Sequence, residues 1–318
     1  MISATVATAA THFGLAFLNR QACPACGAPV AASKAVLASD PPAESLPADQ
    51  LGPLVQGYAG KRTFFTYHHC AECGLVYCPV FFTQAQLDAQ YRHQPENIAD
   101  APLTARACTQ EHYLRILSRY SALTGDYVEI GCDIGLFAEL CARKGNLRKL
   151  WLVEPNHAVH AQLRERVKDL ACVITDEFKP LQISRSSLST AVLIHVVDHM
   201  LEPRQLLAEL REALAPGGVV MIVTHDCRSL LARLLGQRWP PYTLQHPQLF
   251  SPDSLRRVLS ETGFIVETVV KTRNYFPLAY ILRGALTVLG VTIPLSPDWP
   301  LPMLGLRFGN IAAVGRRP

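Results

Sequence analysis

Four cysteines stand in two Cys-x-x-Cys pairs, Cys23 with Cys26 and Cys70 with Cys73. Two such pairs can supply four thiolates to one tetrahedral ion, and Gly74 permits the tight turn that is typical of a metal knuckle. Four thiolates leave no open coordination position, so we expect a structural Zn²⁺ rather than a catalytic metal. The alternative is a set of free, buried cysteines. Three nearby side chains could compete as ligands: His68, His69 and Cys78.

Histidines offer a second kind of chemistry, because imidazole can accept a proton near neutral pH. We rank His246 first as a general base, His199 second and His225 third. His199 closes the pentapeptide HVVDH, His225 ends a strand pattern, and His246 follows Tyr242 in an aromatic segment. The alternative for each histidine is local capping or packing, and we expect Asp198 to be a structural carboxylate.

The sequence EIGCDIG (129–135) places two glycines, Gly131 and Gly135, where a strand should turn into a helix. Glycine lets a ligand approach the backbone, and ligands of open α/β sheets bind beyond the carboxyl ends of the strands. Glu154 ends the next strand pattern, where a carboxylate can accept hydrogen bonds from both ribose hydroxyls of a nucleoside. The alternatives are an ordinary turn and a solvated carboxylate. The GxGxxG spacing of dinucleotide-binding oxidoreductases is absent.

The elements that would position these residues alternate along the chain. Short apolar runs at 127–131, 149–154, 171–175, 190–196 and 218–224 predict strands, and 264–270 and 310–315 would complete the sheet edge. Helical patterns fall at 83–91, 104–123, 136–144, 157–169 and 203–214. The alternation predicts an α/β fold, with a Rossmann-like, mostly parallel, seven-stranded sheet covered by helices on both faces.

The ordered motifs EIGCDIGLFAEL, LVEPN and AVLIHVVDHMLEPRQLLAELREALAPGGVVMIV resemble those of class I S-adenosylmethionine-dependent methyltransferases. The resemblance implies that the glycines line the methionine side of the cofactor, that Glu154 holds the ribose, that Asp176 lies near the adenine and that His195 and Val196 close the pocket. The full set of cofactor-site residues that it implies is Glu129, Gly131, Cys132, Asp133, Gly135, Phe137, Glu154, Pro155, Asp176, His195 and Val196. Family members often have glycine where this chain has Asp133.

A four-cysteine module before such a domain is similar to the bacterial sugar C-methyltransferases, whose additional C-terminal domain has little room here. The resemblance implies roles for Tyr242 and His246 in the active site. We expect a zinc-binding module and linker at 1–95 and a methyltransferase domain at 96–318. We expect a lid at 228–250 over the acceptor, and its Trp239, Pro240, Pro241 and Tyr242 suggest an apolar or ring-shaped substrate. An apolar insertion at 277–306 could line the same cavity.

Composition and charge indicate which kinds of partner, nucleic acid or membrane, the chain is expected to bind. A net charge of +4 on 318 residues gives no electrostatic reason to favour nucleic acid. The start of the chain has no basic region before its apolar stretch, which favours the cytoplasm. We expect no transmembrane segment, although the apolar insertion could touch a membrane surface. The oligomeric state is open.

These observations predict an enzyme that methylates oxygen or carbon of a small molecule, such as a sugar, a lipid-linked glycan or a secondary metabolite. S-adenosylmethionine would supply the methyl group, and a histidine would act as the base. Two alternatives stay open: an RNA methyltransferase and a non-catalytic S-adenosylmethionine-binding protein.

Overall fold

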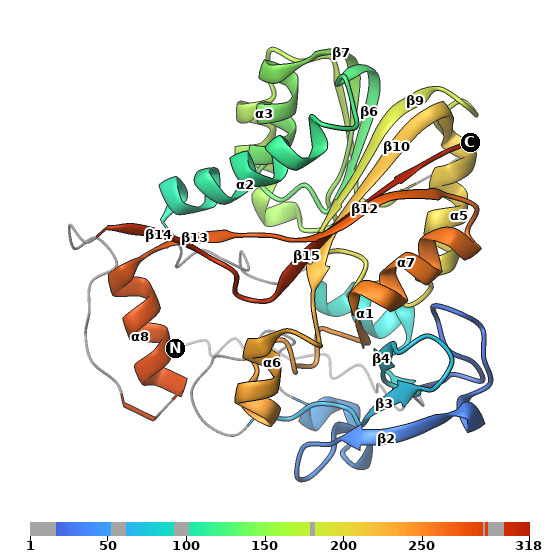
Figure 1. Ribbon diagram of the computed structural model, residues 1–318, viewed down its shortest axis with the longest axis vertical. Coiled ribbons are helices and arrows are strands. Elements are labelled where there is room, and N and C mark those ends of the chain that lie inside the picture. The colour runs from blue at the N-terminus through green and yellow to red at the C-terminus, as the bar shows by residue number, and fades with distance from the viewer. Residues whose placement is uncertain (1–16, 52–61, 92–101, 179–181, 289, 292–301) are drawn as a thin grey trace, which may run out of the picture.

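The computed structural model describes residues 17–51, 62–91, 102–178, 182–288, 290–291 and 302–318. Its centre is a seven-stranded sheet in the order β12-β15-β10-β9-β6-β7-β8 (Figure 1). The strands are β6 (Thr124–Ile130), β7 (Asn146–Val153), β8 (Cys172–Thr175), β9 (Leu188–Ile194), β10 (Leu214–His225), β12 (Ile265–Lys271) and β15 (Asn310–Arg316). All neighbouring pairs from β10 to β8 are parallel, whereas β15 runs antiparallel to both β10 and β12. The predicted α/β fold with a mostly parallel sheet is confirmed.

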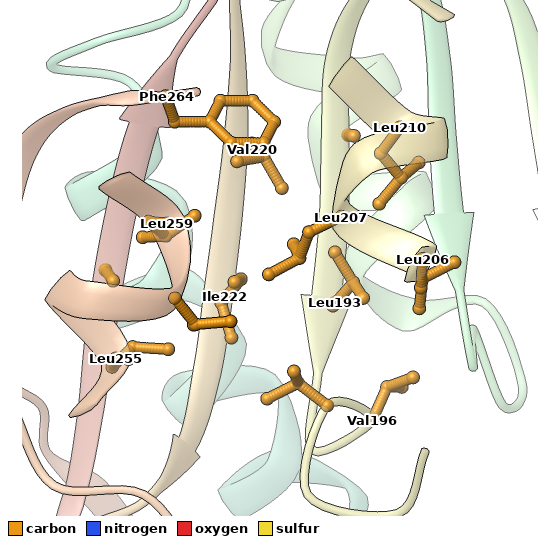
Figure 2. Packing of buried hydrophobic residues seen from close by; sticks show 14 of the residues in the cluster. Leu193, Val196, Leu206, Leu207, Leu210, Val220, Ile222, Leu255, Leu259 and Phe264 are labelled. Carbon is orange, nitrogen blue, oxygen red and sulfur yellow. The ribbon is translucent and has the colours of Figure 1, made fainter. Parts of the chain in front are cut away.

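Helices cover both faces of this sheet because side chains alternate between the faces along each strand. The helices α5 (Pro203–Ala213) and α7 (Pro252–Glu261) lie on one face, where their leucines pack on Val220 and Ile222 of β10 (Figure 2). The other face buries Met221 and Val223 beneath α2 (Leu103–Leu117), α3 (Leu136–Lys144) and α4 (His160–Arg166). These two layers fix the sheet and therefore the position of its carboxyl edge.

A smaller, four-stranded sheet combines the N-terminal segment with the predicted lid. Its order is β11-β4-β3-β2, formed by β2 (Ser33–Leu37), β3 (Tyr67–Cys70), β4 (Val76–Tyr77) and β11 (Gln248–Leu249). Since β11 lies within 228–250, the lid segment is hydrogen-bonded to the cysteine-bearing part of the chain. Figure 1 shows β2, β3 and β4 beyond the end of the central sheet toward which β10 points.

Shorter elements complete the description. They are β1 (Leu18–Asn19), β5 (Val80–Phe81), α1 (Gln84–Tyr91), α6 (Leu230–Leu235), β13 (Asn274–Pro277), α8 (Leu278–Val288) and β14 (Met303–Leu306). The 3-10 turns are η1 (Val30–Ala32), η2 (Ala43–Ser45), η3 (Ala48–Gln50), η4 (His157–Val159) and η6 (Gly236–Arg238). Among the described helices, none has both the length and the apolar character that a membrane crossing needs.

Most differences from the expected elements fall at their ends. The helix expected at 104–123 ends at Leu117, and Leu123 adopts a left-handed backbone with φ of 53° before β6 begins. Strand β10 starts at Leu214 and absorbs the Pro-Gly-Gly sequence through a register shift against β9 between Leu214 and Val219. The expected division at residues 95 and 96 lies outside the described residues and stays a prediction.

Candidate functional site

The glycine turn joins β6 to α3 at the carboxyl edge of the central sheet. Gly131 has a φ of +70°, and a Cβ at this position would lie 2.5 Å from Cγ2 of Val196. Only glycine therefore fits between the end of β6 and the segment that follows β9. Gly135, with a φ of +79°, is required for a different reason, because its Cβ would lie 2.6 Å from Cδ1 of Leu163 in α4.

Glu154 follows β7 and is held by the backbone of the glycine turn. Its carboxylate accepts hydrogen bonds from the backbone N–H of Asp133 (2.7 Å) and of Asn156 (2.8 Å). Burial raises the pKa of Glu154 from its ordinary value, against these two hydrogen bonds. Glu154, at the end of β7, is thus hydrogen-bonded directly to the glycine turn at the end of the neighbouring strand β6.

Asp133, where related domains often have glycine, has a φ of 50°. Aspartate tolerates this left-handed region better than most side chains. Its carboxylate forms an ion pair with Arg106 of α2 at 2.5 Å, and the Arg106 side chain is only 10% exposed. The side chain at this position therefore connects the turn to α2.

Three of the predicted cofactor residues are buried in the core. Cys132 and Phe137 pack with the residues beneath α2 and α3. Glu129 is also buried and accepts a hydrogen bond from the Tyr127 hydroxyl at 2.7 Å. Burial raises the pKa of Glu129 to about 8, although the Tyr127 hydrogen bond opposes the shift. These residues therefore support the glycine turn from the core and do not line its exposed side.

The remaining predicted residues of this edge are more exposed. Asp176, which follows β8, forms an ion pair with His157 at 2.9 Å, and Pro155 is also exposed. His160 bonds through Nε2 to the carbonyl oxygen of Glu154 at 2.7 Å. The ends of β6, β7 and β8 thus bring together the residues predicted for the methionine, ribose and adenine parts of a cofactor.

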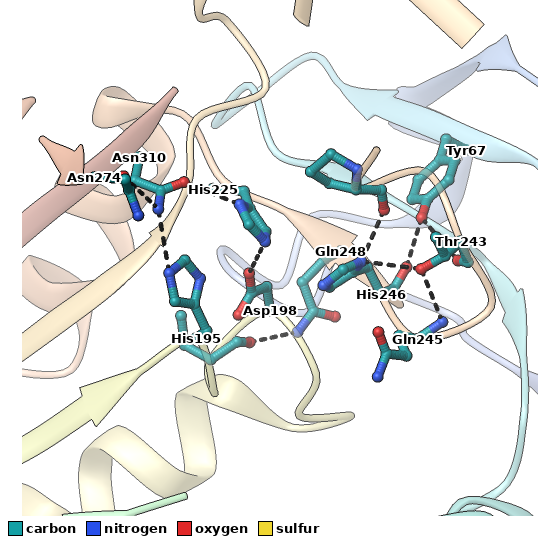
Figure 3. Close-up of polar contacts among 12 residues, drawn as sticks. Tyr67, His195, Asp198, His225, Thr243, Gln245, His246, Gln248, Asn274 and Asn310 are labelled. Carbon is teal, nitrogen blue, oxygen red and sulfur yellow. Dashed lines mark hydrogen bonds and ion pairs between the residues drawn. The ribbon is translucent and has the colours of Figure 1, made fainter. Parts of the chain in front are cut away.

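A cluster of four histidines surrounds Asp198 beside this edge. We call Asp198, His195, His199, His225 and His246 the histidine cluster, and Figure 3 labels all of them except His199. Ring centroids are 4.6 Å apart for His195 and His225, 4.5 Å for His199 and His246, and 5.3 Å for His225 and His246. All three histidines predicted as bases therefore meet at one place, although they come from distant parts of the sequence.

Hydrogen bonds fix the ring nitrogens of two of these histidines. Nδ1 of His246 lies 2.7 Å from the carbonyl oxygen of Pro241, which can only accept, so Nδ1 carries the proton. Nδ1 of His225 lies 3.1 Å from Oδ1 of Asn310, while Nδ2 of Asn310 donates to Asn274 and to Nε2 of His195 (3.2 Å each). In the neutral form of each ring, Nε2 of His225 and of His246 is therefore the nitrogen without a proton.

Asp198 is fully buried at the centre of the cluster. Among the residues that the structure describes, neither of its carboxylate oxygens has a hydrogen-bond partner. Burial lowers the pKa of His246 well below its ordinary value and that of His195 to about 3. Burial raises the pKa of Asp198, but coulombic attraction to the surrounding histidines outweighs this effect and lowers it. The arrangement is a fully buried carboxylate with imidazoles around it.

Sequence reasoning did not identify the residues that hold the cluster in place. Gln248 donates through Nε2 to the carbonyl oxygens of Val197 (2.8 Å) and Met200 (2.6 Å), which fixes the loop after β9. Asn310 and Asn274 stand on β15 and β13, far away in sequence. The spacing His-x-x-Asp-His was the only local signal for Asp198.

The predicted lid residue Tyr242 lies among aromatic side chains of the N-terminal segment. Its ring centroid is 5.2 Å from that of Tyr67 and 5.3 Å from that of Trp239, and burial raises the pKa of Tyr242 to about 12. Trp239 is 2% exposed and packs with Phe64 in the same cluster. The Trp239 ring also lies beside His225, with ring centroids 6.1 Å apart, and its place in the acceptor wall stays a prediction.

The lid and the N-terminal segment are also joined by polar contacts. The Tyr67 hydroxyl donates to the carbonyl oxygen of His246 at 2.7 Å, and the backbone N–H of Cys78 donates to that of Pro247 at 2.8 Å. The guanidinium of Arg62 donates to the carbonyl oxygen of Trp239 at 3.1 Å. The backbone at His246 therefore depends on residues near the cysteine pairs.

The four paired cysteines converge on one point. Sγ of Cys23 lies 3.6 Å from Sγ of Cys73, and Sγ of Cys26 lies 3.7 Å from Sγ of Cys70. A disulfide would require about 2.05 Å, whereas two thiolates bound tetrahedrally at about 2.3 Å are separated by about 3.7 Å. The residues present thus fit a four-thiolate metal site.

The three side chains that could have competed for this metal lie outside the group of four sulfurs. Nδ1 of His68 is 3.1 Å from the Ser33 hydroxyl, and the Cys78 thiol faces the carbonyl oxygen of Phe65. The four sulfurs that converge are therefore those of the two Cys-x-x-Cys pairs.

Comparisons with known proteins point to methyltransferases. The profile of a family described as a methyltransferase domain matches residues 104–269. An O-methyltransferase of Pyrenophora dematioidea is 25% identical over 195 residues, which cover 58% of this chain and 70% of that protein. A ubiquinone biosynthesis O-methyltransferase of Caulobacter sp. (strain K31) is 28% identical over 165 residues. That match covers 48% of this chain and 62% of the relative, less than two thirds of its length.

Among solved structures, magnesium protoporphyrin IX methyltransferase from Synechocystis PCC 6803 with bound SAH is 12% identical and has a TM-score of 0.46. The match covers 74% of this chain and 88% of that one.

Proposed function

The chain belongs to the methyltransferase domain family and uses S-adenosylmethionine, and from this premise we propose that it methylates a hydroxyl oxygen of a small molecule. The observation that carries the proposal is the close contact between Gly131 and Val196. This contact sets the glycine turn directly beside the loop that bears His195, Asp198 and His199 of the histidine cluster. A methyl donor on the turn would therefore face groups that can assist proton removal.

For the cofactor, we assign the methionine side to the glycine turn and the ribose to Glu154. The carboxylate of Glu154 is oriented by two backbone N–H groups, which leaves it lone pairs for ribose hydroxyls. Asp176 is assigned to the adenine side, and His195 with Val196 to the wall next to the acceptor. Glu129, Cys132 and Phe137 are assigned a supporting role, because they are buried behind the turn.

The sulfonium methyl is already activated, so alignment of the acceptor accounts for much of the catalysis. As the acceptor oxygen bonds to the methyl carbon, the carbon–sulfur bond breaks and S-adenosylhomocysteine leaves. The hydroxyl proton must be removed in the same reaction, and we assign that task to the histidine cluster. Within it His246 ranks first, since its Nδ1–H is fixed by Pro241 and its Nε2 keeps a lone pair.

Oxygen is preferred to carbon as the methylated atom because both curated relatives are named O-methyltransferases. A sugar, a lipid-linked glycan or a secondary metabolite with a hydroxyl group suits this chemistry. An RNA acceptor is disfavoured by the small net charge of +4. For the four-cysteine site we propose a structural Zn²⁺, because the sulfur spacing fits tetrahedral zinc.

Calorimetry with S-adenosylmethionine and S-adenosylhomocysteine tests cofactor binding, and S-adenosylhomocysteine release over a panel of hydroxylated metabolites tests transfer. We expect His246→Ala to retain cofactor affinity and to lose turnover by about 10²-fold or more. Unchanged turnover would remove His246 from the reaction. Cofactor binding without transfer to any acceptor would favour a non-catalytic protein, and failure to bind either nucleoside would refute the proposal.

A further inference from the structure

The buried carboxylate of Asp198 has no partner that explains its burial. Both oxygens are without a hydrogen-bond donor among the described residues, and the side chain is 0% exposed. An ionised carboxylate taken out of water without compensation destabilises a protein by several kcal/mol. A cation bound beside Asp198 would offset this cost.

The distances around Asp198 match those between ligands of one metal ion. Nε2 of His225 lies 3.9 Å from Oδ2 of Asp198, which is too long for a hydrogen bond. Ligand atoms at about 2.0–2.1 Å from a metal are separated by about 3.3 Å in a tetrahedron and about 4 Å across an octahedron. The ligand atoms of Asp198, His199 and His246 lie within 4.8 Å of one another, whereas His225 forms such a group with His195 and Asp198.

The hydrogen bonds of the cluster use Nδ1 of His225 and of His246, so Nε2 of each ring is the nitrogen that could bind a metal. Metal-bound histidines usually donate their other ring N–H to an oxygen, which fixes the tautomer and the ring. His246 does so to the carbonyl of Pro241 and His225 to Oδ1 of Asn310. His195 differs, because its Nε2 accepts from Nδ2 of Asn310. Figure 3 shows His225 directed toward Asp198.

We propose that Asp198, His199 and His246 bind one divalent first-row transition-metal ion. Two imidazoles and one carboxylate suit zinc, iron(II) or cobalt rather than magnesium or calcium, which prefer oxygen ligands. The site is separate from the four-thiolate site and differs from it in ligand chemistry. The Pro241 carbonyl would orient His246.

This proposal rests on the proposed function and makes it more specific. A metal with an open position binds the acceptor hydroxyl and favours its ionisation. The oxygen then forms its bond to the methyl carbon while the carbon–sulfur bond breaks, and the hydroxyl proton passes to water. In this form of the reaction His246 acts through the ion instead of as a free base.

Metal content distinguishes the two sites. The full chain is purified, saturated with Zn²⁺ or Co²⁺, freed of excess metal and analysed. We expect about two ions per chain, and about one in either Asp198→Asn or Cys23→Ser. With Co²⁺, the sulfur-to-cobalt charge-transfer band should persist in Asp198→Asn, which also reports that this variant is folded. Asp253→Asn, which changes an exposed carboxylate of α7, should keep both ions.

About one ion per chain in the wild type, absent from Cys23→Ser and unchanged in Asp198→Asn, would overturn the proposal. If the wild type held only this one ion and His246→Ala still lost turnover, His246 would act as a base that is not bound to a metal. Cofactor calorimetry separates the two proposals. Methyl transfer with only the thiolate-bound ion refutes the metal site alone, whereas two ions without cofactor binding refute the proposed function alone.

Discussion

At the residue scale, Gly131 controls how closely the glycine turn approaches the histidine cluster. In Gly131→Ala a Cβ would be forced to 2.5 Å from Cγ2 of Val196, at a φ of +70° that alanine avoids. We expect the free energy of unfolding to fall by about 1–3 kcal/mol. We also expect S-adenosylmethionine affinity to fall, because the turn must move. Urea denaturation and calorimetry measure the two effects.

Gly217→Ala is the matched control, since Gly217 has a φ of +79° but no atom within 4 Å of the position that a Cβ would take. It should reproduce the conformational cost without the loss of affinity. Val196→Ala in the Gly131→Ala background should restore part of the binding. Equal affinity losses at both glycines would contradict a role for the contact with Val196.

Glu129 makes a prediction about pH. Burial raises its pKa from 4.5 to about 8, so the folded chain retains a proton that the unfolded chain releases above pH 4.5. Glu129 therefore makes the free energy of unfolding fall as the pH rises from 4.5 to about 8, and this fall is complete above the pKa of the folded state. Glu129→Gln keeps the Tyr127 hydrogen bond and removes the titration. We expect the free energy of unfolding of the variant, relative to that of the wild type, to increase by up to about 3 kcal/mol as the pH rises from about 5.5 to about 8.

Thermal melts of both proteins across this pH range provide the measurement. Glu165→Gln removes an exposed carboxylate of α4 and should follow the wild-type curve. If the difference between Glu129→Gln and wild type were independent of pH, the buried carboxylate could not be the titrating group.

At the scale of elements, periodicity was sufficient for the central sheet. The strands of its interior are buried on both faces, so they read as continuous apolar runs such as Val219 to Val223. Helix α3 was predicted at the bounds that the structure has, because Gly135 and Gly145 stand on either side of it. Helix α7 was not predicted, although Ser251 and Ser254 form a capping box at its start.

Pairing between distant segments could not be read in the same way. Strand β11 has two residues and no periodic signal, and its partner β4 lies about 170 residues earlier. The glycine turn and Glu154 were predictable, since each ends a strand of a recognisable series. Asn310 and Gln248 were not, because their contacts depend on where β15 and β11 come to lie.

At the scale of the whole molecule, the N-terminal segment and the catalytic part share one core. Cys23 and Cys70 belong to the same buried cluster as Leu193 and Val197, which lead into the histidine cluster. The sheet pairing of β4 with β11 continues this contact to the lid. The four-cysteine site is therefore placed to stabilise the side of the molecule on which we propose that the acceptor binds.

This arrangement predicts that loss of the four-thiolate metal separates cofactor binding from turnover. In Cys70→Ser we expect loss of about one Zn²⁺ per chain and a lower melting temperature, because metal-binding energy contributes to folding. The Tyr67 hydroxyl that fixes the backbone of His246 stands in the same strand as Cys70, so the histidine cluster should lose its order. S-adenosylmethionine affinity should change little, since Gly131 and Glu154 are held by β6 and β7.

Metal analysis, calorimetry and S-adenosylhomocysteine release, measured on one preparation, test the separation. Cys108→Ser, a cysteine of α2 outside the four-thiolate group, is the matched control and should keep zinc, affinity and turnover. Full turnover in zinc-free Cys70→Ser would mean that the acceptor side keeps its structure without the metal. Parallel loss of affinity and turnover would instead show that the four-cysteine site supports the whole carboxyl edge, because β3 would then influence strands on which it does not pack directly.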